Sequence, residues 1–190
     1  MTLTIMNGEK KWIVTRVDGK IASVSIDYKG AAALLARMAA FSPSKFGRVE
    51  TCKMSVIELL DVSQNLVWED LLVFGTPFQQ SVWKALFDLT HPAENGVKLI
   101  CYTDFADILG KAPGVRAVAH AIGLNPLPVI IPCHLVIPKE SLERLRELNE
   151  EENGLFKKET MYMVDRYIDY GEYAFGTALK RELIHLHLNR

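Results

Sequence analysis

The sequence has few cysteines, and none stands at a spacing typical of disulfide frameworks or zinc sites. Its 190 residues hold three, Cys52, Cys101 and Cys133, without a C-x-x-C pair. This odd and widely spaced set argues against a disulfide framework and against a zinc knuckle. No histidine precedes His91, so Cys52 has no nearby partner for a metal, and we expect neither a metal nor another cofactor. Each cysteine is then either a buried apolar residue or a reactive thiol.

The chain also lacks an excess of charge and a long apolar run. Its 22 basic and 23 acidic residues give a net charge of −1, which excludes a globally basic nucleic-acid binder and leaves only a local patch for such contacts. The apolar runs are too short to cross a bilayer, and residues 1–12 have an early polar break unlike a signal peptide. We expect no membrane contact and a cytoplasmic protein (in a bacterial or archaeal cytosol), or a nuclear one in a eukaryote.

The composition that remains is globular, with 49% hydrophobic and 24% charged residues. Apolar and polar residues alternate around Asp18-Gly19, a favoured hairpin turn, which predicts two strands within residues 1–30. The Ala- and Leu-rich residues 30–41 predict a helix. Residues 48–73 are ambiguous, with a strand at 54–60 as one interpretation. The front third therefore reads as a small α+β unit without recognisable chemistry.

A helix start follows at Thr76-Pro77, because threonine is a good N-cap and proline fits the first helical position. Apolar residues recur at helical spacing from there to about residue 89. Two further helices are predicted, one from Thr103 to about residue 109 and one over 115–122, joined by a glycine-containing turn. The pair fits either a helix-turn-helix or an ordinary helical hairpin in a core, and spacing alone favours the hairpin.

An apolar segment bracketed by prolines, residues 125–137, carries a cysteine–histidine pair. The prolines hold the chain extended with few backbone donors, and Cys133 and His134 follow Pro132 directly. A thiol becomes a nucleophile when a base or a positive dipole favours its thiolate. His134 is such a base, but adjacent side chains often diverge, so it would act directly or through one water. The other interpretation of Cys133 is a buried packing residue.

An acidic stretch follows this pair. Residues 139–172 carry ten acidic and six basic side chains, which leaves a net charge of +3 on the rest of the chain. Helical spacing of apolar residues predicts short amphipathic helices over 142–148, 161–168 and 178–188. The preferred interpretation of the acidic stretch is a helical insertion that is exposed to solvent.

Several motifs at joint spacing make the sequence resemble the O6-alkylguanine-DNA alkyltransferases, also called methylated-DNA–protein-cysteine methyltransferases. The likeness covers residues 73–138 without a gap and resumes over 171–184. The motifs that carry it are Gly75-Thr76-Pro77-Phe78-Gln79, Val82-Trp83, Leu86, Tyr102, Arg116-Ala117-Val118, Asn125-Pro126 and Ile131-Pro132-Cys133-His134-x-Val136-Ile137.

The resemblance implies a fold in two parts and a monomer. The first would be an α/β domain of ribonuclease-H-like type over residues 1–72. The second, over residues 73–190, would be a mainly α-helical domain for DNA binding and alkyl acceptance. It would contain a winged-helix or helix-turn-helix motif and would be interrupted by an acidic insert at about residues 139–170.

The implied function is DNA repair. Cys133 would take the alkyl group from O6-alkylguanine, with O4-alkylthymine as a further substrate, in a single irreversible turnover without a separate donor. His134 would act as a base through a bridging water, and Tyr102 would protonate the leaving guanine and contact a backbone phosphate. Asn125 would be the hinge between the helix-turn-helix and the active-site strand.

The implied partner is double-stranded DNA, bound through its minor groove with the alkylated base flipped out. Arg116 would fill the vacated place in the base stack, and small residues would let the second helix approach closely. The DNA-binding set is Arg116, Tyr102, Gly114, Val115, Ala117 and Ala119. The set expected to line the base pocket is Tyr173, Ala174, Val136 and Pro128.

The sequence departs from the family pattern at three places. Leu135 replaces an arginine, for which we expect local repacking, and His187 stands where a late glutamate would orient the histidine, for which we expect slower transfer. The acidic insert follows Ile137. Because its charge would repel phosphates, we expect it to lie away from DNA or to cover the pocket as a lid.

The sequence leaves two other functions open. A lesion-binding protein of the same fold with weak or no transfer is favoured by the missing glutamate, whereas the presence of Cys133 argues against it. An unrelated Cys–His hydrolase is the third interpretation, but no oxyanion loop is recognisable in the sequence.

Overall fold

The computed structural model describes residues 11–26, 29–41, 47–91, 98–151 and 168–188. The chain forms two compact units, one from residues 1–95 and 124–132 and the other from residues 96–123 and 133–190. Each unit therefore draws on two separate stretches of chain, and the domain boundary predicted after residue 72 stays a prediction. Within the described ranges, each helix is too short or too polar to cross a bilayer.

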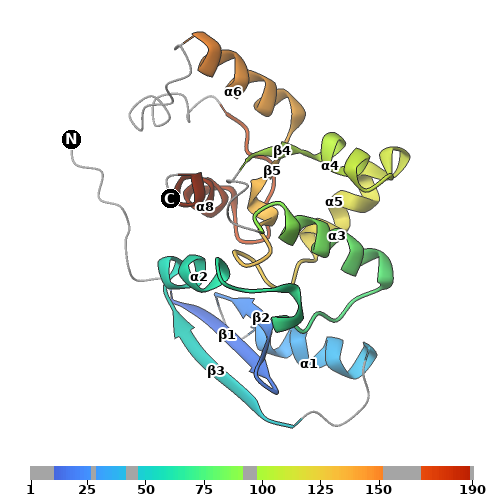
Figure 1. The fold of residues 1–190 in the computed structure, drawn as a ribbon, viewed down its shortest axis with the longest axis vertical. Coiled ribbons are helices and arrows are strands. Elements are labelled where there is room, and N and C mark those ends of the chain that lie inside the picture. Colours follow the sequence, from blue (N-terminus) through green and yellow to red (C-terminus); the bar gives the residue numbers. More distant parts are fainter. Residues whose placement is uncertain (1–10, 27–28, 42–46, 92–97, 152–167, 189–190) are drawn as a thin grey trace, which may run out of the picture. The chain divides into compact units, whose positions relative to one another are not determined.

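The first unit is built on a three-stranded antiparallel sheet in the order β2-β1-β3 (Figure 1). Strands β1 (Trp12–Val17) and β2 (Lys20–Ser25) form the hairpin that the sequence predicts. Its turn residues Asp18 and Gly19 both have positive φ, 50° and 83°, a conformation that glycine adopts freely and aspartate tolerates. Strand β3 (Val49–Met54) pairs with the other edge of β1.

The strand predicted at 54–60 is wrong, because β3 ends at Met54 and residues 56–60 lie in the helix α2 (Val56–Ser63). Ser55 and Glu58 form a capping box in which the Ser55 hydroxyl accepts from the Glu58 N–H and the Glu58 carboxylate accepts from the Ser55 N–H. This exchange satisfies two backbone donors at the helix start, and it outweighs the strand preference of the β-branched residues.

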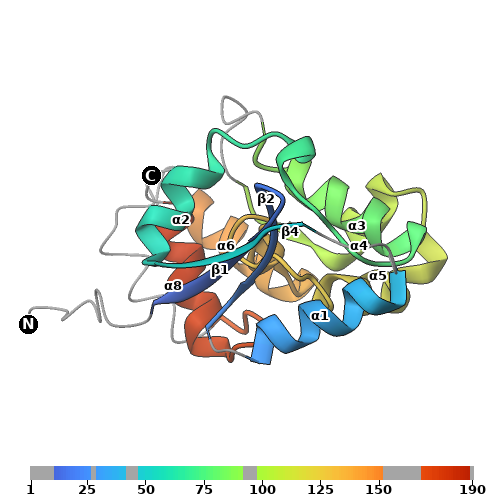
Figure 2. The same ribbon diagram turned by 90° about the horizontal axis from the view of Figure 1, so that it is seen from below.

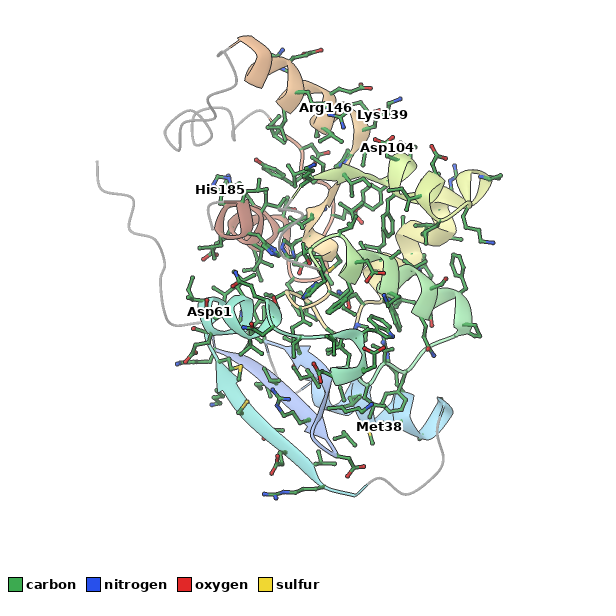
Figure 3. The ribbon with its side chains drawn as sticks, in the orientation of Figure 1. Met38, Asp61, Asp104, Lys139, Arg146 and His185 are labelled. Carbon is green, nitrogen blue, oxygen red and sulfur yellow. The ribbon has the colours of Figure 1, made fainter. Side chains whose placement is uncertain are left out.

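Helix α1 (Lys29–Phe41) lies against β2 (Figure 2). Its Met38, labelled in Figure 3, belongs to an apolar cluster with Val17, Ala22, Leu34 and Phe74. After the short turn η1 (Trp68–Asp70), helix α3 (Pro77–Asp88) begins where the sequence predicts.

The start of α3 is fixed by a second capping box. The Thr76 hydroxyl accepts from the Gln79 N–H at 3.2 Å, and the Gln79 side chain accepts from the Thr76 N–H at 2.9 Å. The helix buries one apolar face made of Val82, Trp83, Leu86 and Phe87.

The second unit contains the short parallel pair β4 (Ile100–Cys101) and β5 (Val136–Ile137). Helix α4 (Tyr102–Ile108) follows β4 directly, and the turn η3 (Ala112–Gly114) joins it to α5 (Val115–Gly123), which packs beside it (Figure 1). The N-cap of α4 is Cys101 instead of the predicted Thr103. The sulfur accepts from the Asp104 N–H at 3.4 Å, so the helix begins one residue after the strand ends.

The segment around the cysteine–histidine pair is less extended than predicted. Cys133, His134 and Leu135 form the 3₁₀ turn η4, and only Val136–Ile137 continue as a strand. This turn matters for the site, because successive side chains of a 3₁₀ helix point about a third of a turn apart, and not to opposite faces as in a strand.

Two helices close the second unit, α6 (Lys139–Glu151) and α8 (Thr177–Leu188). They share an apolar cluster with the β4–β5 pair and the segment 168–170. Its members are Cys101, Ile137, Leu142, Leu145, Ile168, Tyr170 and Ile184. The outward face of α6 carries charged residues that include Lys139 and Arg146 (Figure 3). The helix predicted at 161–168 lies outside the described residues up to position 167.

Gly75→Ala is expected to lower the free energy of unfolding by about 1–3 kcal/mol, the usual cost of overpacking a core. A Cβ at Gly75 would lie 2.6 Å from the Trp83 ring, which is fully buried and has no room to move. Urea denaturation followed by circular dichroism measures the change.

Gly123→Ala is the matched control, because a Cβ there meets nothing within 4 Å. Equal stability of Gly75→Ala and the wild type would contradict the packing described for α3.

Candidate functional site

Cys133 opens the η4 turn, and only 7% of it is exposed. It is not in a disulfide, and its Sγ lies 4.0 Å from the Tyr173 hydroxyl. The η4 turn packs against α8, so side chains of that helix lie near the turn that holds the thiol. A thiol this deeply buried is a packing residue unless polar groups surround it, and here several do.

The first polar group is His134, the next residue of the turn, which is completely buried. Its Nε2 lies 2.9 Å from Nδ1 of His187 near the end of α8, and the two rings are 5.2 Å apart between centroids. Burial, with smaller contributions from His187 and Lys180, lowers the pKa of His134 well below its usual value. His134 is therefore neutral at pH 7, with one ring nitrogen donating and the other accepting.

The second polar group is Lys180, which is only 1% exposed. Its ammonium donates to the Val136 carbonyl at 2.8 Å and lies 5.8 Å from the centroid of the Tyr102 ring. Burial lowers the pKa of Lys180 to about 8, although the charges of Cys133 and Asp169 act in the opposite direction. Most Lys180 side chains are thus still protonated at neutral pH.

Two tyrosines flank these groups. Burial raises the pKa of Tyr102, the first residue of α4, and negative charge at Cys133, Glu172 and Asp169 adds to the effect. Burial and the neighbouring Cys133 raise the pKa of Tyr173 well above its usual value. Both phenols keep their protons at neutral pH and can act as hydrogen-bond donors.

The structure brings Tyr102, Cys133, His134, Val136 and Tyr173 into the second unit around this cluster. Val136 is fully buried. Ala174, next to Tyr173, is exposed and lies between Gly171 and Gly176, whose positive φ values of 74° and 91° define the bends of this segment.

Asn125 and Pro128 belong to the first unit instead. The Asn125 amide donates to the Ile131 carbonyl at 2.8 Å, and its oxygen accepts from the Leu127 N–H at 3.0 Å. These bonds close a tight loop in which the β-branched Val129 adopts a φ of 75°, a conformation that such residues avoid. The asparagine thus shapes the backbone just before Cys133.

The residues predicted to contact DNA lie on η3 and α5. Val118, Ala121 and Ile122 form the buried face of α5. Arg116 and Ala117 are exposed, and Gly114, Val115 and Ala119 are half-buried. Apart from Arg116 near the start of α5, the residues predicted to contact DNA on η3 and α5 thus have small or medium-sized side chains.

Lys180 is a residue of this cluster that the sequence motifs above do not include. A signal was available, because Lys180 stands at helical spacing with the buried residues Leu183 and Ile184. A lysine on the apolar face of an amphipathic helix is rarely fully buried unless nearby groups compensate its charge. Within the described ranges, no group of three or more His, Cys, Asp or Glu side chains could hold a metal ion.

A buried thiol surrounded by a neutral imidazole, an ammonium and two protonated phenols can act as a nucleophile that forms a covalent bond. A family model described as "6-O-methylguanine DNA methyltransferase, DNA binding domain" matches residues 77–161, which include Tyr102, Cys133 and His134. The geometry and this match agree on the same segment.

Curated relatives match stretches of the chain of comparable length. A probable methylated-DNA–protein-cysteine methyltransferase of Acanthamoeba polyphaga mimivirus is 40% identical over 72 residues, 38% of this chain and 45% of the relative. The methylated-DNA–protein-cysteine methyltransferase of Haemophilus influenzae is 34% identical over 99 residues, 51% of this chain and 50% of the relative. These matches thus span half or less of each relative's length.

Solved structures extend the likeness to the fold of nearly the whole chain. An O6-methylguanine-DNA methyltransferase from Pyrococcus kodakaraensis has a TM-score of 0.57 at 20% identity, covering 95% of this chain and 94% of that one. A Mycobacterium tuberculosis OGT crystallised with DNA has a TM-score of 0.52 at 22% identity, covering 93% and 86%. Residues 77–161 thus match the DNA-binding domain of the 6-O-methylguanine DNA methyltransferases, the resemblance that the sequence motifs carry.

The burial of neutral His134 predicts a stability that falls in acid. The unfolded chain binds a proton at this histidine near pH 6.5, whereas the folded chain resists it, so protonation favours unfolding below about pH 6.5. Between about pH 7.5 and 5.5, the wild type is expected to lose roughly 1 kcal/mol more stability than His134→Gln.

Urea denaturation at the two pH values measures this difference. His120→Gln is the matched control, because His120 is an exposed histidine on α5. A wild type and a His134→Gln variant that lose the same stability in acid would show that His134 is not held neutral.

Proposed function

We propose that the chain repairs DNA by transferring a methyl or larger alkyl group from O6-alkylguanine, and from O4-alkylthymine, to Sγ of Cys133. The nearly buried thiol beside His134, Tyr102 and Lys180, inside the segment that matches the family, carries this proposal. The names of the curated relatives support the same activity.

The transfer needs no cofactor, because its atoms balance within the protein and the DNA. The Cys133 thiolate attacks the alkyl carbon, so that an S–C bond forms while the bond from that carbon to the guanine O6 breaks. The electron pair of the broken bond stays with guanine, which takes a proton on its ring. The thioether does not leave, and each protein molecule therefore acts once.

Two residues handle the protons in this proposal. His134 takes the thiol proton through a bridging water. This role is supported by its buried Nδ1, which has no hydrogen-bond partner among the described protein groups, while Nε2 is held by His187. Tyr102 donates a proton to the departing guanine, a role supported by the phenol's keeping its proton at neutral pH, as its raised pKa implies.

The DNA is proposed to be double-stranded and bound through its minor groove by a monomer. In this view α4, η3 and α5 are the helix-turn-helix of a winged-helix domain, and the first unit's sheet belongs to a ribonuclease-H-like domain. The ribonuclease-H-like assignment is supported by the antiparallel strand order β2-β1-β3 and by α1, which follows β2 and precedes β3 along the chain. The small outward face of α5 supports close approach to a groove.

The alkylated base is proposed to leave the duplex, at a cost on the order of a few kcal/mol of unstacking. Arg116 replaces it in the stack, while Tyr173, Ala174 and Val136 line its pocket, and Pro128 stays a prediction for that pocket. Asn125 is proposed as the hinge before the cysteine segment, a role that its bonds to Leu127 and Ile131 support. The acidic insert is proposed to lie away from phosphates.

Incubation with duplex DNA that carries O6-methylguanine is expected to add one methyl group to the wild-type protein and none to Cys133→Ser. Intact-mass spectrometry measures the gain. Cys52→Ser is the matched control, because Cys52 is exposed and lies on β3 in the first unit. Tight binding of the damaged duplex without any gain in mass would favour a lesion-binding protein instead.

Arg116→Ala is expected to slow transfer from duplex DNA by at least about tenfold, while the dependence of binding on salt changes little. An inserted side chain stabilises the flipped state, whereas a phosphate contact would change the salt slope by about one. Rapid-quench kinetics and binding titrations at several salt concentrations separate the two effects.

Lys111→Ala, which removes another exposed cation of the second unit, is the control for general loss of charge. Equal transfer rates for Arg116→Ala and Lys111→Ala would remove Arg116 from the proposed role.

A further inference from the structure

Lys180 has an environment that the reaction described above does not explain. Its ammonium is almost completely buried and has one hydrogen bond, to the Val136 carbonyl at 2.8 Å. The face of the Tyr102 ring lies 5.8 Å away, and negative charge at Cys133 and Asp169 also favours the ammonium. Within the described residues Lys180 forms no ion pair with a carboxylate. A buried cation with such partial compensation is costly unless an anion forms nearby.

The anion that the geometry offers is the thiolate of Cys133. Four titratable groups face Lys180 from the elements around it: Cys133 and His134 on η4, Tyr102 on α4, and Asp169 in the segment before α8. Tyr102 keeps its proton, and His134 is neutral. Asp169 is exposed, so water screens its charge more than that of a buried thiolate.

His134, the histidine next to the thiol, does not supply the positive charge, because burial lowers its pKa well below the usual value. In a pair of histidine and carboxylate, the carboxylate stabilises the imidazolium that forms when the histidine takes a proton. Here the partner of His134 is His187, a second imidazole with no negative charge to offer. A proton added to His134 would also lie near the Lys180 ammonium, which opposes it.

We propose that Lys180 is the positioning residue that stabilises the Cys133 thiolate in this chain, supplying the fixed positive charge that the buried His134 does not hold. The inference rests on the proposed function of Cys133 as the alkyl acceptor. Through its bond to Val136, the ammonium also fixes the strand that follows the cysteine turn.

The proposal sets the pH at which the thiol becomes reactive. Burial alone would move the thiolate to higher pH than an exposed cysteine, whereas a nearby ammonium moves it to lower pH. Because the pKa of Lys180 is about 8, the ammonium is present over the neutral range. Cys133 is therefore expected to reach half of its maximal reactivity at lower pH than the exposed Cys52 of the same molecule.

Alkylation by iodoacetamide tests this without DNA. The S–C bond forms as the C–I bond breaks, iodide leaves, and the thiol proton goes to solvent. Rates at Cys133 and Cys52 are followed by peptide mass spectrometry from about pH 6 to 10 in the full chain. Cys52 is the internal reference in every sample.

Three variants accompany the wild type. Lys180→Met is expected to slow alkylation of Cys133 at neutral pH by about tenfold and to move its midpoint to higher pH, with Cys52 unchanged. Lys180→Arg keeps a permanent charge and is expected to restore the low midpoint. Lys139→Met is the matched control, because Lys139 is exposed on α6 in the same unit.

A wild-type midpoint for Cys133 at or above that of Cys52 overturns the proposal, whether or not the variants fold. An unchanged Cys133 profile in a folded Lys180→Met variant also overturns it. Thermal unfolding by circular dichroism establishes which variants are folded. If Cys133 responds to Lys180 as expected but accepts nothing from O6-methylguanine duplexes, the role of Lys180 stands and the proposed repair function fails.

Discussion

The hydrogen bond from the buried Lys180 ammonium to the Val136 carbonyl connects the parts of the second unit that surround the thiol. It joins α8 to β5, which directly continues the turn that holds Cys133 and His134. The same ammonium faces the ring of Tyr102, the first residue of the helix that follows β4. Because an unpaired ammonium inside a protein is costly, the two contacts of Lys180 together constrain α8, β5 and α4.

The imidazole pair gives the site its second constraint. His134 and His187 are held together at 2.9 Å, and since burial keeps His134 neutral, one nitrogen of this contact donates and the other accepts. A glutamate at position 187 would favour a charged histidine, whereas this pair favours a neutral one. Among the described groups around the cysteine, the positive charge thus lies on Lys180 and not on His134.

Much of the fold follows from local signals in the sequence, and the rest depends on contacts that no local signal contains. The Asp18-Gly19 turn and the Thr76-Pro77 helix start are confirmed, because each depends on the conformations and donors of neighbouring residues. The strand predicted at 54–60 is wrong because the Ser55–Glu58 capping box starts a helix there. In the site, the motifs point to Cys133 and His134. Lys180 comes near them only through the packing of α8 against η4, which no local signal in the sequence contains.

The central claim, that Cys133 is the alkyl acceptor, is tested most directly by following the alkyl carbon itself. A duplex with a ¹³C-labelled methyl on the guanine O6 is allowed to react, and the protein is then digested and examined by NMR. The account predicts an S-methyl resonance in the peptide that contains Cys133 and an unmethylated guanine in the DNA. Label on any other residue, or label that stays on guanine while the protein binds the duplex, would contradict it.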